Sequence, residues 1–388
     1  MKAKIPINPD TLRWARESIN MPEEEVAFKM NKDTAVIKEW ESGVSSPTYI
    51  QLETLAYTIY KRPIAIFFFP EPPTELSPQN SFRTLPESEL EQLSSKFLRL
   101  FRRAQAMQAN LEELNEGLNP VPKKIFKDLR FKPSENVQSI AKVVREYLGV
   151  ELDVQIHWEN IETALKKWRS IVEAHGVFVF KDAFRQDDLS GFCLYDDEFP
   201  IIYINNSIPS TGRQIFTLFH ELIHLLFSTG GIDKENDAYL RQIHGDNKKI
   251  EILCNRFAGE FLVPENDFRK SVYRRKINDE IVEQLAAKYK VSWEVIVRKC
   301  LDKGLINQSY YEAKRQEGIK RAAEKRRGAQ RGNYYFNQAT YLGDSYLNLV
   351  FRKYYQNRFS TEQLAEFLNV KVNHIPGLET VFLGRGES

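Results

Sequence analysis

The stretch FTLFHELIHLLF, residues 216–227, decides how the rest of the chain is interpreted. Its apolar composition is typical of a buried helix, in which His220 and His224 lie on one face, one turn apart. Two imidazoles at this spacing can bind one Zn²⁺ ion. Glu221 lies about 100° further round the helix, where its carboxylate can take a proton from an attacking water instead of binding the metal.

The competing interpretation is a helix with two incidental histidines. Polar groups inside so apolar a helix need a reason, because burying them without partners is costly. A third metal ligand would favour the zinc site. The downstream stretch IEILCNRFAGEFLVP (250–264) offers Glu251 and Glu260, and His244 lies in the loop between the two segments. The pattern alone does not choose among them.

Strand-like runs precede the histidine stretch, at VFVF (177–180), SGFCLY (190–195) and PIIYIN (200–205). The acidic residues 196–198 predict a turn between the last two runs, so we expect a hairpin that leads into the histidine helix. Helices are predicted near 135–148 and 160–174, and another over about 249–262 that Pro264 ends.

Composition narrows the class of protein. The 388 residues are 42% hydrophobic and 28% charged, which is typical of a globular chain of two or three domains. The net charge of +2 excludes a chain that is basic throughout, so any nucleic-acid contact must be a local patch. Three scattered cysteines disfavour a disulfide framework. Without an apolar signal region or a membrane-length apolar run, we expect a cytoplasmic protein with no membrane partner.

Helical spacing, a helix stop at Gly43 and a cluster of prolines from residue 63 onward predict a bundle of short helices over residues 9–60. Residues 74–87 are rich in proline and serine and predict a connector. Residues 312–331 hold eight Lys or Arg against three Glu, a pattern typical of a solvated helix face.

The stretches GVFVF, LSGFCLYDDEFPIIYINN, RQIFTLFHELIHLL and EILCNRFAGEFLVP together resemble the ImmA/IrrE family of zinc endopeptidases. The resemblance runs from about 125 to 268. It implies Zn²⁺ as the cofactor, His220, His224 and Glu251 as its ligands, and Glu221 as the general base. It also implies a repressor or antitoxin protein as the substrate. The chain departs from the family at Ile223, where members usually have glycine, and this larger residue could crowd the cleft.

Three further residues are candidates for substrate binding. Tyr203 and Asn205 lie on the strand PIIYIN, and an edge strand can pair with an extended substrate backbone. His244 could donate to a developing oxyanion. The alternative readings are core-facing strand residues for the first two and a solvent-facing loop histidine for the third.

Residues 12–73 resemble the XRE/Cro-type helix-turn-helix, through IKEWESG and PTYIQLETLA. The resemblance implies a third helix that enters the major groove of DNA, and a dimer would double its contacts. The residues it would present are Lys32, Asp33, Thr34, Ala35 and Lys38. Residues 1–73 carry nine basic and ten acidic side chains, so phosphate neutralisation is weak and a protein-binding or dimerisation role is the alternative.

We therefore expect a multidomain α+β protein: an all-α helix-turn-helix domain, a zincin-like α+β metalloprotease domain with a small sheet, and a helical C-terminal region. Its expected segments are 1–73, a linker and helix over 74–124, the peptidase over 125–268, a helix-turn-helix-like part over 269–311, and a basic linker with a helical tail over 312–388. Residues 332–371 resemble the tail of longer fusions of the two families.

Two functions compete. In the first, a DNA-binding zinc endopeptidase cleaves a repressor or antitoxin and so controls a phage, mobile-element, stress or toxin-antitoxin operon. In the second, the protein is a non-enzymatic DNA-binding regulator or antitoxin, and the zincin-like domain binds a partner or senses a signal.

Overall fold

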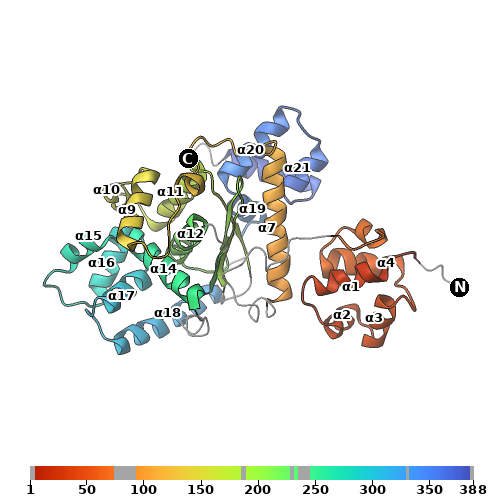
Figure 1. The fold of residues 1–388 in the computed structure, drawn as a ribbon, viewed down its shortest axis with the longest axis horizontal. Helices are drawn as coiled ribbons and strands as arrows, with labels where there is room; N and C mark the ends of the chain where they lie inside the picture. Colours follow the sequence, from red (N-terminus) through yellow and green to blue (C-terminus); the bar gives the residue numbers. More distant parts are fainter. Residues whose placement is uncertain are drawn as a thin grey trace. The chain divides into compact units, whose positions relative to one another are not determined.

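The computed structural model describes residues 5–73, 93–184, 189–227, 231–234, 245–328 and 332–384. The chain divides into two compact units, Met1–Gln105 and Ala106–Ser388 (Figure 1). Helices dominate and one small sheet is present, so the α+β fold class is confirmed. The described residues include no helix with the length and apolarity needed to cross a bilayer.

The first unit is all helical within its described residues. Its elements are α1 (Pro9–Glu17), α2 (Glu23–Met30), α3 (Thr34–Glu41), α4 (Tyr49–Glu53), η1 (Thr54–Tyr60), η2 (Ile64–Phe68) and the first half of α7 (Ser95–Leu114). Polar side chains begin several of them: Asn8 caps α1, Asp33 caps α3, and Thr48 forms a capping box with Gln51 at α4.

A buried ion pair joins α1 to α3 in this unit. Arg16 Nε donates to Glu41 Oε1 at 2.7 Å, and Glu41 is almost fully buried beside Trp40. Between α2 and α3 the chain reverses at Asn31, whose φ of 53° lies in the left-handed region that asparagine tolerates. Leu12, Val26 and Ile37 fill the interior between these helices.

The second unit contains the sheet. Its strands are β1 (Phe178–Asp182), β2 (Leu189–Leu194), β3 (Ile201–Asn205) and β4 (Gly231–Lys234), in the order β1-β3-β2-β4. The hairpin predicted from the acidic turn is confirmed, because β2 and β3 pair antiparallel. The pairing of β1 with β3 is parallel, which leaves β1 and β4 at the two edges of the described sheet.

Helices precede and follow the sheet in this unit. Before it come α8 (Ile125–Asp128), α9 (Val137–Leu148), α10 (Leu152–Ile156) and α11 (Ile161–Ala174). Between β3 and β4 lies α12 (Thr211–Leu226), and after β4 come α14 (Gly245–Leu262), α15 (Glu265–Val272), α16 (Asp279–Tyr289), α17 (Trp293–Asp302) and α18 (Gln308–Gly328). The C-terminal elements are α19 (Tyr334–Leu342), α20 (Asp344–Tyr355), α21 (Thr361–Phe367), η3 (Val372–His374) and α22 (Ile375–Leu383).

Both faces of the sheet are covered, and strand alternation separates their side chains. Val179, Cys193 and Ile202 belong to the core shared with α11, α12 and α14. On the other face Phe180 packs edge-on against Tyr346 of α20, with ring centroids 5.3 Å apart. α12 lies close along the sheet (Figure 1), and a Cβ on Gly191 would come within 2.4 Å of the Thr217 methyl group.

The C-terminal helices are attached to the sheet by Arg169 of α11. Its guanidinium donates to the carbonyl oxygens of Thr340 (2.7 Å) and Leu342 (2.9 Å) at the end of α19, and also to that of Val179 on β1. Glu173 completes the joint, since it pairs with Arg169 at 3.1 Å and accepts a hydrogen bond from Ser345 at 2.6 Å. These contacts place α19 and α20 firmly within the second unit.

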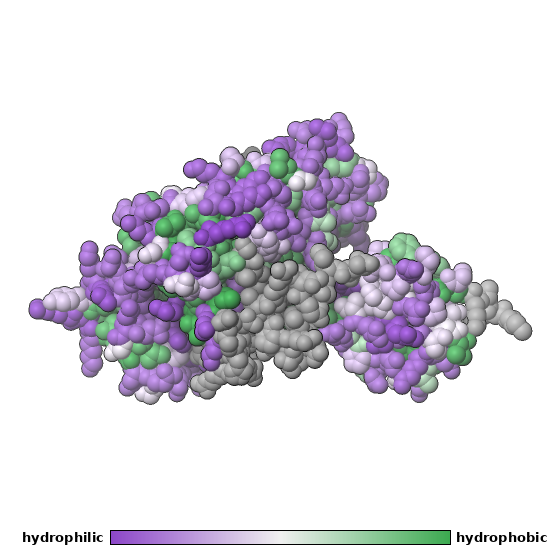
Figure 2. Space-filling model, in the orientation of Figure 1, coloured by the Kyte–Doolittle hydropathy of each residue, from purple (hydrophilic) through white to green (hydrophobic). Residues whose placement is uncertain are grey.

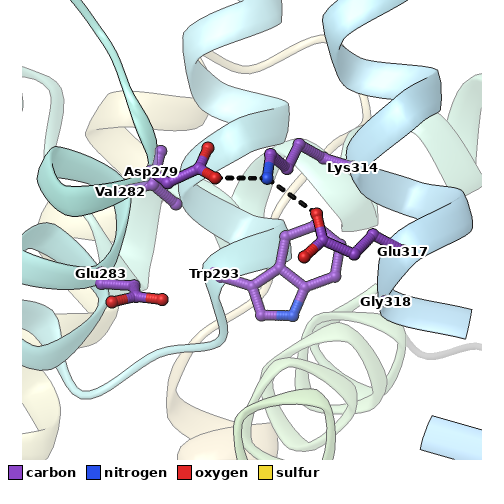
Figure 3. Close-up of a pocket in the computed structure, with 7 residues that line it drawn as sticks. All are labelled: Asp279, Val282, Glu283, Trp293, Lys314, Glu317 and Gly318. Atoms are coloured by element: carbon purple, nitrogen blue, oxygen red, sulfur yellow. Dashed lines mark hydrogen bonds and ion pairs between the residues drawn. The ribbon is translucent and has the colours of Figure 1, made fainter. Parts of the chain in front are cut away.

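A small pocket of about 60 Å³ opens between α16, α17 and α18 (Figure 3). Lys314 Nζ lies in it between Asp279 Oδ2 at 2.5 Å and Glu317 Oε2 at 2.7 Å. The Trp293 ring rests against Gly318, where any Cβ would clash with it. The residues that line the pocket therefore attach α18 to α16 and α17.

The visible surface is mostly hydrophilic, with scattered apolar residues (Figure 2).

Candidate metal centre

Three potential metal-ligating side chains meet between α12 and α14. His220 Nε2 lies 3.3 Å from Glu251 Oε2, and His224 Nε2 lies 3.2 Å from Glu251 Oε1. The two Nε2 atoms are 3.2 Å apart. Within the described residues this is the one group of three such side chains whose ligand atoms all lie within 4.8 Å of one another. The structure thus brings together the two histidines of the sequence pattern and the glutamate that the family resemblance implied.

The cluster is buried: His220, His224 and Glu251 are 1%, 0% and 4% exposed. Burial by itself raises the pKa of the Glu251 carboxyl, but the charges and hydrogen bonds of His224 and His220 outweigh it and lower that pKa to about 2. Glu251 is therefore an anion at neutral pH. A buried anion that faces two imidazole nitrogens is a donor set suited to a divalent cation.

The spacing of the donors also fits zinc. In a tetrahedral site with Zn–N bonds of about 2.0 Å, neighbouring ligand atoms lie about 3.3 Å apart. The two imidazole nitrogens are 3.2 Å apart, and each lies 3.2 to 3.3 Å from one oxygen of the Glu251 carboxylate, His224 from Oε1 and His220 from Oε2. Two nitrogens and one carboxylate oxygen also match the donor types of a catalytic zinc site, which keeps its fourth position for water or substrate.

Local sequence explains why α12 presents its histidines at this point. Ser210 caps the helix by accepting from Arg213 N. The apolar residues Leu218, Leu222 and Leu225 are fully buried in the core and fix the rotation of the helix. The remaining face then directs His220 and His224 toward α14, which contacts α12 extensively.

Glu221 and Ile223 flank the ligands on the same helix. Both are fully buried. Glu221 lies outside the three-residue ligand group, as its position on the helix predicted. Ile223 belongs to the hydrophobic core, so the side chain that departs from the usual glycine contributes to packing.

Glu260 and Cys254 lie outside the three-residue cluster. Glu260 lies on α14 but pairs with Lys299 at 2.9 Å and accepts from Glu265 N, so its role is structural. Cys254 is fully buried in the core. His244 lies outside the described residues.

Tyr203 and Asn205 require a correction. They lie on β3, which is an interior strand with β1 on one side and β2 on the other. Both are buried, and Asn205 Nδ2 donates to Leu189 O at 2.7 Å. The edge-strand argument therefore does not apply to them, because the β3 backbone is already paired.

The residues expected to contact DNA lie around the start of α3. Lys32, Asp33, Ala35 and Lys38 are exposed and Thr34 is half-buried. Asp33 accepts from Ala35 N as the helix cap, and Lys38 Nζ lies 3.5 Å from Glu23 Oε2. The five residues form a largely exposed face, in which the Lys38 ammonium already has Glu23 as an ion-pair partner.

Sequence reasoning missed Arg145 and Gln155. Both are buried and hydrogen-bonded to the C-terminal end of α14. A signal for Arg145 existed: it falls on the apolar face of residues 137–148, between Val144 and Leu148, where a charged residue needs a buried partner.

Residues 172–301 match a family model described as the IrrE N-terminal-like domain, a family of peptidases. The matched span contains His220, His224 and Glu251, together with the whole described sheet. It covers about a third of the chain, and α9 and α10 lie before it. No curated protein matches the chain.

Proposed function

We propose that the protein is a zinc-dependent endopeptidase whose metal is held by His220, His224 and Glu251. The observation that carries the proposal is the meeting of these three buried side chains: the two imidazole nitrogens are 3.2 Å apart, and each lies within 3.3 Å of a Glu251 carboxylate oxygen. The match of the surrounding residues to a peptidase family supports the same conclusion.

Zinc bound here would polarise the scissile carbonyl and lower the pKa of the attacking water, so that the water loses its proton more easily. The chain's own contribution is the movement of the proton. The Glu221 carboxylate receives the proton of the attacking water and passes it to the leaving amine. Its position one residue after His220 puts it on the ligand-bearing helix but outside the ligand group.

The substrate that we propose is a repressor or antitoxin protein, bound in an extended conformation. β4 is an edge strand of the described sheet and contacts α12, which carries two of the three ligands. An extended segment that pairs with such an edge would pass beside the metal. This assigns to β4 the role that the sequence had suggested for the strand of Tyr203.

For the first unit we propose binding to DNA through the exposed face at α3, as a dimer on paired half-sites. Support comes from the exposed Lys32 and Lys38 at a helix that follows a tight turn. Together the two units would form a regulator that controls an operon by proteolysis.

Two measurements test the proposal. Metal analysis of the purified protein should find one zinc per chain, and none in Glu251→Ala. The parent and Glu221→Gln are then each incubated with a cell extract, and new protein N-termini are mapped by mass spectrometry. We expect cleavage by the parent and a loss of 10²-fold or more in Glu221→Gln, within the usual range for a general base. Equal cleavage by both would refute the peptidase. Normal operon control by Glu221→Gln in cells would favour the non-enzymatic regulator.

A further inference from the structure

The two ligand-bearing helices are joined by a pair of stacked rings. Phe219 of α12 and Phe261 of α14 have ring centroids 4.2 Å apart and an interplanar angle of 29°. Phe219 directly precedes His220, so this stack lies beside the metal ligands. Trp168 of α11 packs edge-on against Phe219 at 4.9 Å, and all three side chains are fully buried.

Arg145 of α9 holds the α14 side of this stack. Its guanidinium carbon lies 4.6 Å from the centre of the Phe261 ring, a cation–π contact in a buried environment. The same guanidinium donates to the backbone carbonyl of Phe261, and to Val150 O at 2.9 Å. Arg145 thus contacts both the ring and the backbone of Phe261.

Gln155 also forms hydrogen bonds at the same end of α14. Its side-chain oxygen accepts from Arg145 Nη2 at 2.8 Å, and its Nε2 donates to Leu262 O at 2.9 Å and Tyr289 O at 2.7 Å. Two side chains therefore satisfy the last carbonyl groups of α14, where the helix dipole favours a cation. They do so from α9 and α10, which precede the family-matched residues 172–301.

We propose that Arg145 is a positioning residue of the metal centre: it fixes α14 against α12 and so sets the distance of Glu251 from the two histidines. The proposal rests on the metal site proposed above. Metal ligands must be held to within a fraction of an ångström, and here they come from two separate helices. Because α14 is one continuous helix, a shift or rotation at Phe261 moves Glu251 with it.

The test compares Arg145→Met with Arg169→Met. Arg169 is the matched control, because it is also buried and donates to backbone carbonyls, but those carbonyls belong to α19 and β1. Zinc affinity is measured by competition with a chelating dye, and ligand geometry by the visible absorption of the Co²⁺-loaded protein. Thermal unfolding of each variant reports its stability separately.

We expect Arg145→Met to weaken zinc binding at least tenfold and to change the cobalt bands, whereas Arg169→Met keeps parental values of both even if its stability falls equally. Parental zinc affinity and cobalt bands in folded Arg145→Met would overturn the proposal. If that variant does not fold, Arg145→Lys decides by the same two readouts, since lysine keeps the charge but cannot reproduce the fork of donors. A parent that binds no zinc would instead overturn the metal site itself.

Discussion

The polar residues of α12 and those of α3 differ in what their surroundings require of them. His220 and His224 are buried in an apolar helix and face a buried carboxylate. Lys32 and Lys38 are exposed at the surface of the first unit. A buried polar group must have a partner, whereas an exposed one is solvated wherever it points.

The difference shows why the two proposed sites have unequal support. On α12 the spacing, the burial and the third ligand all constrain one chemistry. At α3 the exposed face is compatible with DNA, with a protein or with solvent, and the ion pair between Lys38 and Glu23 weakens the electrostatic case. Experiments that change one polar group at a time can break or sharpen this contrast.

The largest effect is expected at the buried ligands. His220→Ala, His224→Ala and Glu251→Ala should each lower zinc affinity by about a thousandfold or more, because each removes one of three protein ligands. Isothermal titration with zinc measures the loss. His157→Ala and Glu260→Ala are the controls, the first an exposed histidine and the second a glutamate of the same helix as Glu251. One tightly bound zinc retained in any ligand variant would refute the assignment.

Removal of the metal should have the next largest effect. A chelator is expected to lower the unfolding free energy of the second unit by about 3 kcal/mol if free zinc stands near 100 times its Kd. Calorimetric scans with and without the chelator measure this as a decrease in Tm. His224→Ala should show no response, since it lacks the site. A chelator effect of equal size in that variant would show that the stabilising metal is bound elsewhere.

Glu198 is intermediate in exposure between the buried residues of α12 and the exposed residues of α3, because its side chain is 26% exposed. Hydrogen bonds from Lys124 and then Lys127 lower the pKa of its carboxyl to about 2. A lowered folded-state pKa stabilises the fold above the ordinary glutamate pKa, and this stabilisation is lost as the pH falls toward 2. After allowance for solvent screening we expect Glu198→Gln to cost about 1 kcal/mol at pH 7 and less at pH 3.

Urea unfolding of the parent and Glu198→Gln at the two pH values measures that change. Glu146→Gln is the control, because Glu146 forms a more open pair with Lys142 at 3.7 Å. A cost for Glu198→Gln that is the same at pH 3 as at pH 7 would contradict the role assigned to its charge.

The smallest effects are expected at α3. Lys32→Ala should weaken binding to DNA several-fold and reduce the salt dependence by about one counterion. Lys38→Ala should do less, because Lys38 is already paired with Glu23. Fluorescence anisotropy with a labelled duplex at several salt concentrations measures both. Lys142→Ala in the second unit is the control, and a response equal to that of Lys32→Ala would place the contact outside α3.

The parts that could be predicted from the sequence are those set by local periodicity. The histidine spacing places two ligands on one face of α12, and the acidic turn predicts the β2–β3 hairpin, which is confirmed. Glu251 was assigned by family resemblance, since no local rule relates two helices separated by a loop. The structure brings it to the histidines.

The order of the strands and the buried contacts of Arg145 could not be predicted in the same way. β3 becomes an interior strand because β1 pairs with it from outside the hairpin, and that parallel pairing is non-local. For this reason the edge-strand argument for a substrate contact at Tyr203 does not hold. The role of Arg145 depends on Phe261, which is far along the chain.

The division of the chain into the five segments expected from the sequence stays a prediction.

The contacts of Arg169 also bear on whether an edge of the sheet is open to strands of other chains. β1 is an edge strand of the described sheet, and exposed edges recruit strands from neighbouring chains into aggregates. Here Val179 N donates to Glu173 Oε1 at 3.4 Å and Val179 O accepts from Arg169, while α19 packs against the strand. We therefore expect α11 and α19 together to hinder strand addition at this edge, and a chain cut after α18, which lacks α19, to be less soluble than the whole chain.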